Sequence, residues 1–284
     1  GTTAELLCAT KHPAIKAVIP GWSDFDLYRS PVRPYGLVAS KFIKKWGLYV
    51  RLLDRNRSLF LGGSVRPVVE DSLKPALKEH KDNMHVYKSV KNGEHRNTSM
   101  DGFNYQKCSV VRWKKEIEAS NVPMLVLASW MDAGTAEGTI QRLENFSNSQ
   151  KVVLMATSHG GWCHASPFTV SDSLLYPVPT MQVQNQLRLE FFDYHLKGKG
   201  TEVEEWPLIR YFNMGEEKFK ESNEWPIPGT VETNFYFQQD GGLSTAKPTG
   251  EQGSDSYKVD FGTATSKENR WTTQMGGAVK NPVS

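Results

Sequence analysis

The chain has 284 residues, of which 38% are hydrophobic and 23% charged, and its net charge is +3. This composition supports a folded core and excludes intrinsic disorder, and the scattered charge excludes a nucleic-acid footprint. No apolar run approaches the roughly 18 residues of a membrane helix, so no membrane partner is expected. Three widely spaced cysteines, Cys8, Cys108 and Cys163, favour neither a disulfide framework nor a metal site, and we expect no cofactor.

The first part of the chain has the pattern of an α/β layer. Residues 3–11 favour a helix, and residues 15–19 form a short β-branched run that ends at Pro20-Gly21. Residues 29–118 differ, because 37–53 and 69–80 show helical spacing with charges on one side. We therefore predict a helical insertion after the first layer.

Two apolar runs follow the insertion, at residues 122–128 and 151–156, with a predicted helix at about 134–145 between them. Both runs are continuous rather than alternating, which is typical of parallel strands buried on both faces. A long amphipathic helix is predicted at 183–196 and ends at Lys197-Gly198. These elements continue the α/β layer.

The composition changes again after Glu205. Short aromatic runs at 208–212 and 233–237 alternate with Gly, Pro, Asn and Asp turns. This alternation predicts an antiparallel β domain at the C-terminal end of the sequence.

Two polar residues stand directly after the paired apolar runs. Asp132 follows the first run and His159 follows the second. Functional groups of open α/β sheets gather at the carboxyl ends of strands, and acid before histidine is the α/β-hydrolase order. A serine hydroxyl needs a neighbouring imidazole to take its proton, and the imidazole needs a carboxylate to hold its tautomer. The pair therefore indicates the acid and base of a catalytic triad.

Simpler interpretations exist for each residue. A single Asp after a strand is commonly a helix cap, and a single His is commonly a structural residue. His164 competes with His159 for the role of base but lies farther from the strand end. Cys163 is a potential nucleophile, although a buried thiol is the simpler interpretation without an elbow around it.

At these residues the sequence resembles the cocaine-esterase/X-Pro dipeptidyl-peptidase family of serine hydrolases. The matching segments follow the family order: His12–Pro20, Trp22–Tyr28, Val122–Asp132, Leu154–His159, Phe191–Gly198, Met214–Glu216, Trp225-Pro226 and Asp240–Ser244. The match at 154–159 is looser, since Met155, Ala156 and Thr157 replace the Gly, Pro and Trp of the family.

The resemblance implies an α/β fold: the C-terminal part of an α/β-hydrolase sheet with an inserted helical cap, followed by an incomplete antiparallel β jelly-roll domain. The implied division is hydrolase core at 1–28 and 119–200, cap at 29–118 and jelly roll at 201–284. Gly1 resembles the last glycine of the family's nucleophile elbow. The nucleophilic serine is then expected three residues before Gly1, and the final jelly-roll strands beyond Ser284, so the chain alone is expected to be inactive.

The resemblance further implies hydrolysis of an ester or amide, of acyl-ester or X-Pro dipeptidyl type, through an acyl-enzyme. The partner is then a small-molecule ester or amide or a peptide; we leave open a homodimer and assign no compartment. Trp22, Phe25, Trp130 and Trp162 are candidates for an apolar substrate pocket, although core packing explains most of them equally well. Glu137 is expected on the helix after Asp132 rather than in the site.

A different class of function is a binding protein without catalysis. Its β region would bind carbohydrate or another ligand, with a hydrolase-like part as scaffold. The aromatic residues that could form a sugar-stacking face are Trp206, Tyr211, Trp225 and Tyr236. Packing of alternating strand residues into a core is the simpler explanation.

Overall fold

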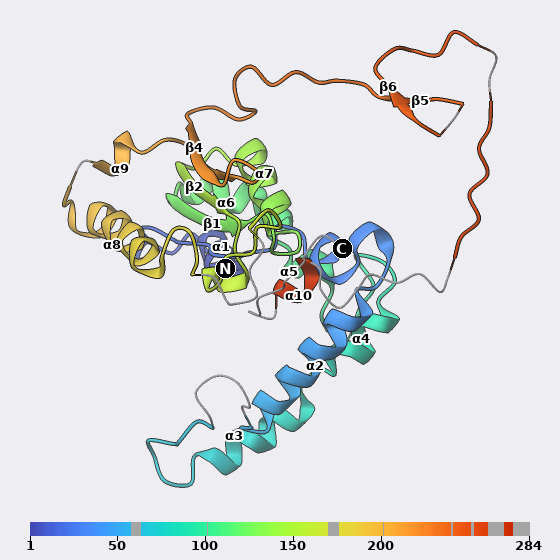
Figure 1. Ribbon diagram of the computed structural model, residues 1–284. Coiled ribbons are helices and arrows are strands. Elements are labelled where there is room, and N and C mark those ends of the chain that lie inside the picture. The colour runs from blue at the N-terminus through green and yellow to red at the C-terminus, as the bar shows by residue number, and fades with distance from the viewer. Residues whose placement is uncertain are drawn as a thin grey trace.

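The computed structural model describes residues 1–57, 64–100, 102–169, 176–200, 202–239, 241–250, 253–260 and 270–274 (Figure 1). The α/β part comprises α1 (Thr2–Ala9), α6 (Lys114–Ser120), β1 (Met124–Ser129), α7 (Thr135–Asn145), β2 (Gln150–Met155), η5 (His159–Gly161), α8 (Met181–Lys197), α9 (Glu202–Glu205), β3 (Ile209–Asn213) and β4 (Lys218–Ser222). The predicted helices at 3–11, about 134–145 and 183–196 and the predicted strands at 122–128 and 151–156 are confirmed, with bounds shifted by a few residues.

The main sheet has the order β1-β2-β3-β4. β1 pairs with β2 in parallel from Met124↔Gln150 to Ser129↔Met155, and β3 continues the sheet in parallel beside β2. The predicted first strand lies on the other side of β1, with parallel bridges Val18↔Met124 and Gly21↔Leu127. The carboxyl ends of these parallel segments therefore lie at one edge of the sheet.

Helices cover both faces of this sheet because successive strand residues point to opposite sides. Met124, Val126 and Ala128 face a core that includes residues of α1, α6 and α7. Leu125 and Leu127 face the opposite core, which is covered by α8 and α9. Continuous apolar strands are therefore buried on both faces, as predicted.

The stretch between the first strand segment and α6 is helical in its described residues. It contains η1 (Tyr28–Val32), η2 (Pro34–Gly36), α2 (Ser40–Asp54), α3 (Leu73–Glu79), η3 (His80–Asp82), α4 (Val86–Asn92), α5 (Tyr105–Cys108) and η4 (Val110–Trp113). A separate core containing Ile43, Val90 and Tyr105 holds the base of α2 against α4 and the segment around α5. Figure 1 shows α2 and α3 projecting from the α/β body as an arm.

The structure corrects the prediction for residues 208–212. The sequence pattern assigns this run to a separate antiparallel β domain, but β3 pairs in parallel with β2 of the α/β sheet. β4 then returns antiparallel to β3 and forms the edge of the same sheet. Ile209 and Phe212 are buried in the cores of the α/β body, which explains why this short run joins the sheet.

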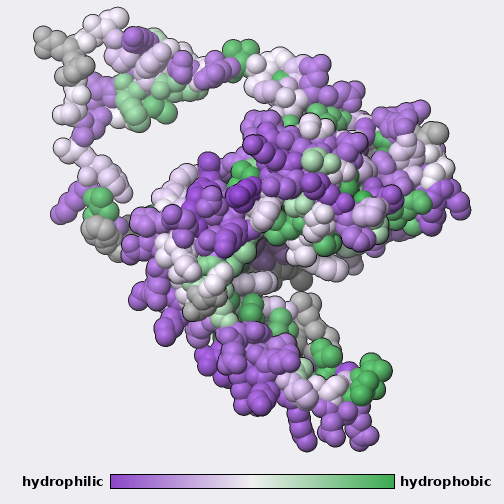
Figure 2. All heavy atoms as spheres, turned by 180° about the vertical axis from the view of Figure 1, so that it is seen from behind, coloured by the Kyte–Doolittle hydropathy of each residue, from purple (hydrophilic) through white to green (hydrophobic). Residues whose placement is uncertain are grey.

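The described residues after β4 do not form the predicted jelly roll. Their strands are β5 (Tyr236–Phe237) and β6 (Leu243–Ser244), which pair with each other as a short hairpin. Phe235, Phe237 and Leu243 are exposed, and Figure 2 shows hydrophobic atoms on the surface of this extended segment. α10 (Arg270–Thr273) returns to the α/β body. The remainder of the predicted domain, including Asp240 of the matching segment, lies outside the described residues.

Candidate functional site

Ser129, the last residue of β1, joins the two loops that carry Asp132 and His159. Its hydroxyl donates to the carbonyl of Thr157 over 2.6 Å and accepts from the amide of Thr157 over 2.8 Å. The same oxygen accepts from the amide of Met131 over 3.1 Å. Because Ser129 is fully buried, these bonds are shielded from water and hold the two strand ends in a fixed relation.

The structure brings Asp132 and His159 together. His159 Nδ1 lies 2.9 Å from Asp132 Oδ2, and Thr135 Oγ1 donates to the same carboxylate oxygen over 3.3 Å. Asp132 is fully buried, whereas the His159 side chain is 40% exposed. The carboxylate can therefore fix the imidazole through Nδ1 while the rest of the ring remains partly accessible.

The two groups alter each other's pKa. Burial raises the pKa of Asp132, although its hydrogen bond with His159 and the charge of that ring oppose the rise. Burial lowers the pKa of His159, but the hydrogen bond and charge of Asp132, together with the charge of Asp24, outweigh it and leave this pKa raised. The pair thus favours a protonated imidazole, the state that a general base reaches after accepting a proton.

The loop after β2 can hold His159 because glycine follows it. Gly161 has a φ of +72°, and an added Cβ would lie 2.5 Å from the Gln184 side chain of α8. Gln184 donates to the carbonyl of Gly161 over 3.1 Å. The turn is therefore packed so closely against α8 that a side chain at position 161 would displace it.

Asp24 is a second carboxyl group beside the pair and is not among the residues predicted from sequence. It follows the first parallel strand segment and so lies at the same edge of the sheet. Ser30 Oγ donates to Asp24 Oδ1 over 3.2 Å. Burial, followed by the negative charge of Asp132, raises the pKa of Asp24 to about 7. The strand-end rule that indicates Asp132 and His159 also applies to this residue.

We expect Asp24→Asn to stabilise the fold at alkaline pH. The pKa of Asp24 rises from an ordinary 3.8 to about 7 on folding, so the folded state binds this proton more tightly than the unfolded state. Ionisation of Asp24 therefore lowers the free energy of unfolding of the wild type. This loss is complete above about pH 7 and disappears as the pH falls toward about 4. Urea unfolding at pH 8 should give the variant the higher free energy of unfolding, with a smaller difference at pH 5.

Asp26→Asn is the matched control for this prediction. Asp26 accepts hydrogen bonds from the amides of Tyr28 and Arg29 and pairs with Arg96. Its neutralisation removes these charge-assisted bonds and should destabilise the fold. Equal destabilisation by both variants at pH 8 would contradict the assignment of Asp24 as a carboxyl group whose burial opposes folding.

An apolar pocket of about 270 Å³ opens beside His159, between the α/β body and the helical insertion. Asp24, Tyr105, His159 and Gln274 supply its ionisable and amide groups. The other lining side chains are Leu27, Pro31, Val32, Phe42, Ile43, Trp46, Met84, Val86, Val90 and Phe103. Such a pocket suits an apolar group of a ligand.

The four predicted pocket residues occupy different places, and none lines this pocket. Trp22 lies beside His159, with ring centroids 6.4 Å apart. Phe25 is buried in the core against Phe146, and Trp130 packs inside while its Nε1 donates to the carbonyl of Phe212. Trp162 is 61% exposed. Most of the residues that line this pocket belong to the insertion.

The alternative residues around the pair have other partners. His164 Nε2 lies 3.4 Å from Glu217, and its ring packs edge-on against Phe212. Cys163 has a free, partly buried thiol, and its backbone amide donates to Ser158 Oγ. Glu137 lies on α7, as expected, and its carboxylate pairs with Arg29 over 2.7 Å.

The aromatic residues considered for a sugar-stacking face do not form one. Trp206 packs against the core beneath α8, while Tyr211 and Trp225 pack against the opposite core of the same sheet. Tyr236 lies in the separate β5–β6 hairpin. The simpler interpretation of the first three residues, core packing, is the one that the structure supports.

The described ranges contain no group of three or more His, Cys, Asp or Glu side chains able to hold a metal ion. Within those ranges, no helix has the length and apolar character needed to cross a membrane. Asp24, Asp132 and His159 place two carboxyls and one imidazole at this edge of the sheet, a set suited to proton transfer.

Comparison with curated proteins gives two groups of relatives. A protein from Mycobacterium bovis named as a serine esterase is 28% identical over 308 residues, which cover 97% of this chain and 48% of that protein. The cocaine esterase of a Rhodococcus species is 22% identical over 293 residues, covering 87% of this chain and 46% of that protein. The chain thus spans about half the length of the curated relatives it matches.

Solved structures share the fold at low sequence identity. A CocE/NonD family hydrolase from Staphylococcus aureus has a TM-score of 0.58 at 16% identity, over 86% of this chain and 37% of that one. An aminopeptidase from a marine-sediment Thaumarchaeota archaeon has a TM-score of 0.55 at 16% identity, over 86% and 40%. Residues 1–161, more than half of the chain, match the X-Pro dipeptidyl-peptidase (S15) family, and the chain therefore belongs to this family of hydrolases.

Proposed function

We propose that this chain supplies the acid and base of a serine hydrolase, with Asp132 as acid, His159 as base and the nucleophilic serine preceding Gly1. The observation that carries the proposal is the 2.9 Å Asp132–His159 contact beside an apolar pocket. The resemblance of Gly1 to the last glycine of the family's nucleophile elbow supports a serine three residues upstream.

The proposed reaction is cleavage of an ester or amide through an acyl-enzyme. His159 Nε2 takes the proton of the serine as its oxygen attacks the carbonyl carbon, and Asp132 stabilises the imidazolium through Nδ1. The imidazolium then protonates the leaving alcohol or amine, and water releases the acyl group in a second cycle. The apolar pocket favours substrates with an apolar acyl group, of acyl-ester or X-Pro dipeptidyl type.

A fluorophosphonate probe tests where the nucleophile lies. The 284-residue chain should take no adduct and should not hydrolyse p-nitrophenyl butyrate, since its serines near the pair, Ser129 and Ser158, are buried. Protein extended upstream through the expected elbow should take one adduct and hydrolyse the ester. Intact mass and absorbance report both results. A stoichiometric adduct on the 284-residue chain would contradict the upstream position.

A further inference from the structure

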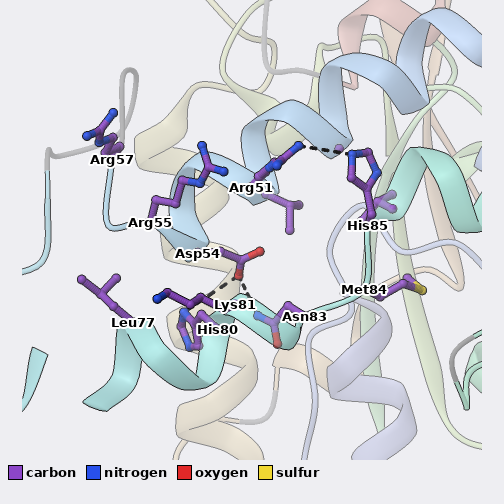
Figure 3. Close-up of a pocket in the computed structure, with 13 residues that line it drawn as sticks. Arg51, Asp54, Arg55, Arg57, Leu77, His80, Lys81, Asn83, Met84 and His85 are labelled. Carbon is purple, nitrogen blue, oxygen red and sulfur yellow. Dashed lines mark hydrogen bonds and ion pairs between the residues drawn. The ribbon is translucent and has the colours of Figure 1, made fainter. Parts of the chain in front are cut away.

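A second pocket, of about 570 Å³, lies farther out along the arm and is independent of the proposed reaction. It is formed by the outer half of α2, the end of α3 with η3, and the start of α4 (Figure 3). Met84 and Val86 belong to its lining and also to that of the pocket beside His159, so the two pockets share one wall. His159 itself does not line it.

The lining of this outer pocket is strongly basic. Arg51, Arg55, Arg57 and Lys81 line it, while Asp54 is its one acidic lining residue. The formal charge of the lining is therefore +3 with neutral histidines, which equals the net charge of the whole chain. A pocket wall that concentrates one sign of charge raises the local concentration of the opposite ion.

The basic side chains lack carboxylate partners in the described part of the protein. Elsewhere, Arg29, Arg142 and Arg210 each pair with a glutamate. No described carboxylate lies within ion-pair distance of the four cationic residues of the pocket. Asp54 accepts instead from Asn83 Nδ2 over 2.8 Å and lies 3.9 Å from His80 Nδ1. The lining thus has more hydrogen-bond donors than acceptors.

Arg51 and His85 lie beside each other in the lining, and both residues are exposed to solvent. His85 Nδ1 accepts the amide hydrogen of Lys88 over 3.4 Å, so the proton of a neutral ring is on Nε2. Nε2 faces Arg51 Nη1 over 3.4 Å (Figure 3). Both atoms are then donors, and they remain donors if the ring is charged. An anionic oxygen that lies beside both atoms would accept from both.

We propose that this pocket binds a phosphate monoester that carries an apolar group. Arginine forks match phosphate oxygens in pairs, and Arg51, Arg55 and Lys81 all line this pocket. Val50, Leu77 and Met84 supply apolar surface for the organic part. The volume of about 570 Å³ exceeds what phosphate alone would fill and lies within the range of small-molecule sites.

The experiment is a calorimetric titration of the whole protein with phenyl phosphate. Benzyl alcohol is the uncharged comparison. Vesicles of phosphatidylcholine with and without phosphatidic acid form a second arm, since a soluble ester and a lipid headgroup present the same chemistry. We expect saturable binding of phenyl phosphate and none of benzyl alcohol. The double variant R51Q/R55Q should weaken binding by about a hundredfold, because each charged hydrogen bond contributes about tenfold or more.

The matched control is K41Q/K45Q, which removes the same charge from exposed positions of the same helix outside the pocket. Loss of binding in R51Q/R55Q but not in K41Q/K45Q supports the site. Binding of phosphatidic acid vesicles alone, with the same dependence on Arg51 and Arg55, supports it with a lipid as the source. Absence of binding in both arms, or equal weakening by the two double variants, overturns it. Circular dichroism checks that each variant is folded.

Discussion

Replacing His159 by alanine in the upstream-extended protein should lower kcat by about 10⁴- to 10⁶-fold, because the serine would lose its base. Asp132→Asn should lower kcat by about 10⁴-fold, since an amide no longer holds the required tautomer. Esterase assays measure both effects, and circular dichroism checks that both variants are folded. His164→Ala is the control: its ring contacts Glu217 and Phe212 rather than Asp132, so kcat should be largely retained.

The pH dependence of kcat/KM distinguishes a general base from a structural histidine. As the proposed base, His159 would accept the serine proton only in its neutral form. Its pKa is raised above the ordinary 6.5: burial lowers this pKa, but the hydrogen bond and charge of Asp132, together with the charge of Asp24, outweigh it. Activity should therefore fall as the pH drops through a value above 6.5. The residual activity of Asp132→Asn should fall at a lower pH than that of the wild type, because the carboxylate that raises the pKa of His159 is gone. Wild-type turnover in His159→Ala would assign the base elsewhere.

The second large effect concerns stability and a buried ion pair. Arg142 on α7 and Glu5 on α1 are both fully buried, and Arg142 Nη2 lies 2.6 Å from Glu5 Oε2 and 3.0 Å from Ser23 Oγ. Arg142→Met would leave the Glu5 carboxylate buried without its counter-charge. The free energy of unfolding should fall by about 3–5 kcal/mol, measured by urea denaturation.

Two controls separate the charge effect from a general loss of contacts. Arg29→Met breaks the exposed pair with Glu137, also on α7, and should change the free energy of unfolding by less than about 1 kcal/mol. The double variant E5L/R142M removes both buried charges and should recover much of the lost stability. A loss for Arg142→Met no larger than that for Arg29→Met would show that the pair is energetically unimportant.

The pair also has a geometric consequence for the proposed site. α1 would follow the nucleophile, α7 follows Asp132, and Ser23 directly precedes Asp24. Arg142 connects all three segments by hydrogen bonds in a region without water-exposed surface. Arg142 therefore holds α1 and α7 in register, the two helices that would flank the proposed nucleophile and acid.

The sequence by itself determined the α/β body and the candidate pair. Continuous apolar runs predict strands buried on both faces, and such strands must be parallel neighbours covered by helices, which places their carboxyl ends at one edge. This physical constraint is local enough to identify Asp132 and His159 from the order of residues alone. The helical character of the insertion also follows from local periodicity.

Only the tertiary structure decided which residues form the pocket and where the residues after α9 belong. Phe25 and Trp130 are aromatic and close to the site in sequence, but they pack inward, while Phe42, Ile43 and Trp46 of the insertion line the pocket. β3 joins the parallel sheet because its apolar residues complete the cores beside β2. Such choices depend on which distant surfaces meet and exclude water, and local pattern carries no information about that meeting.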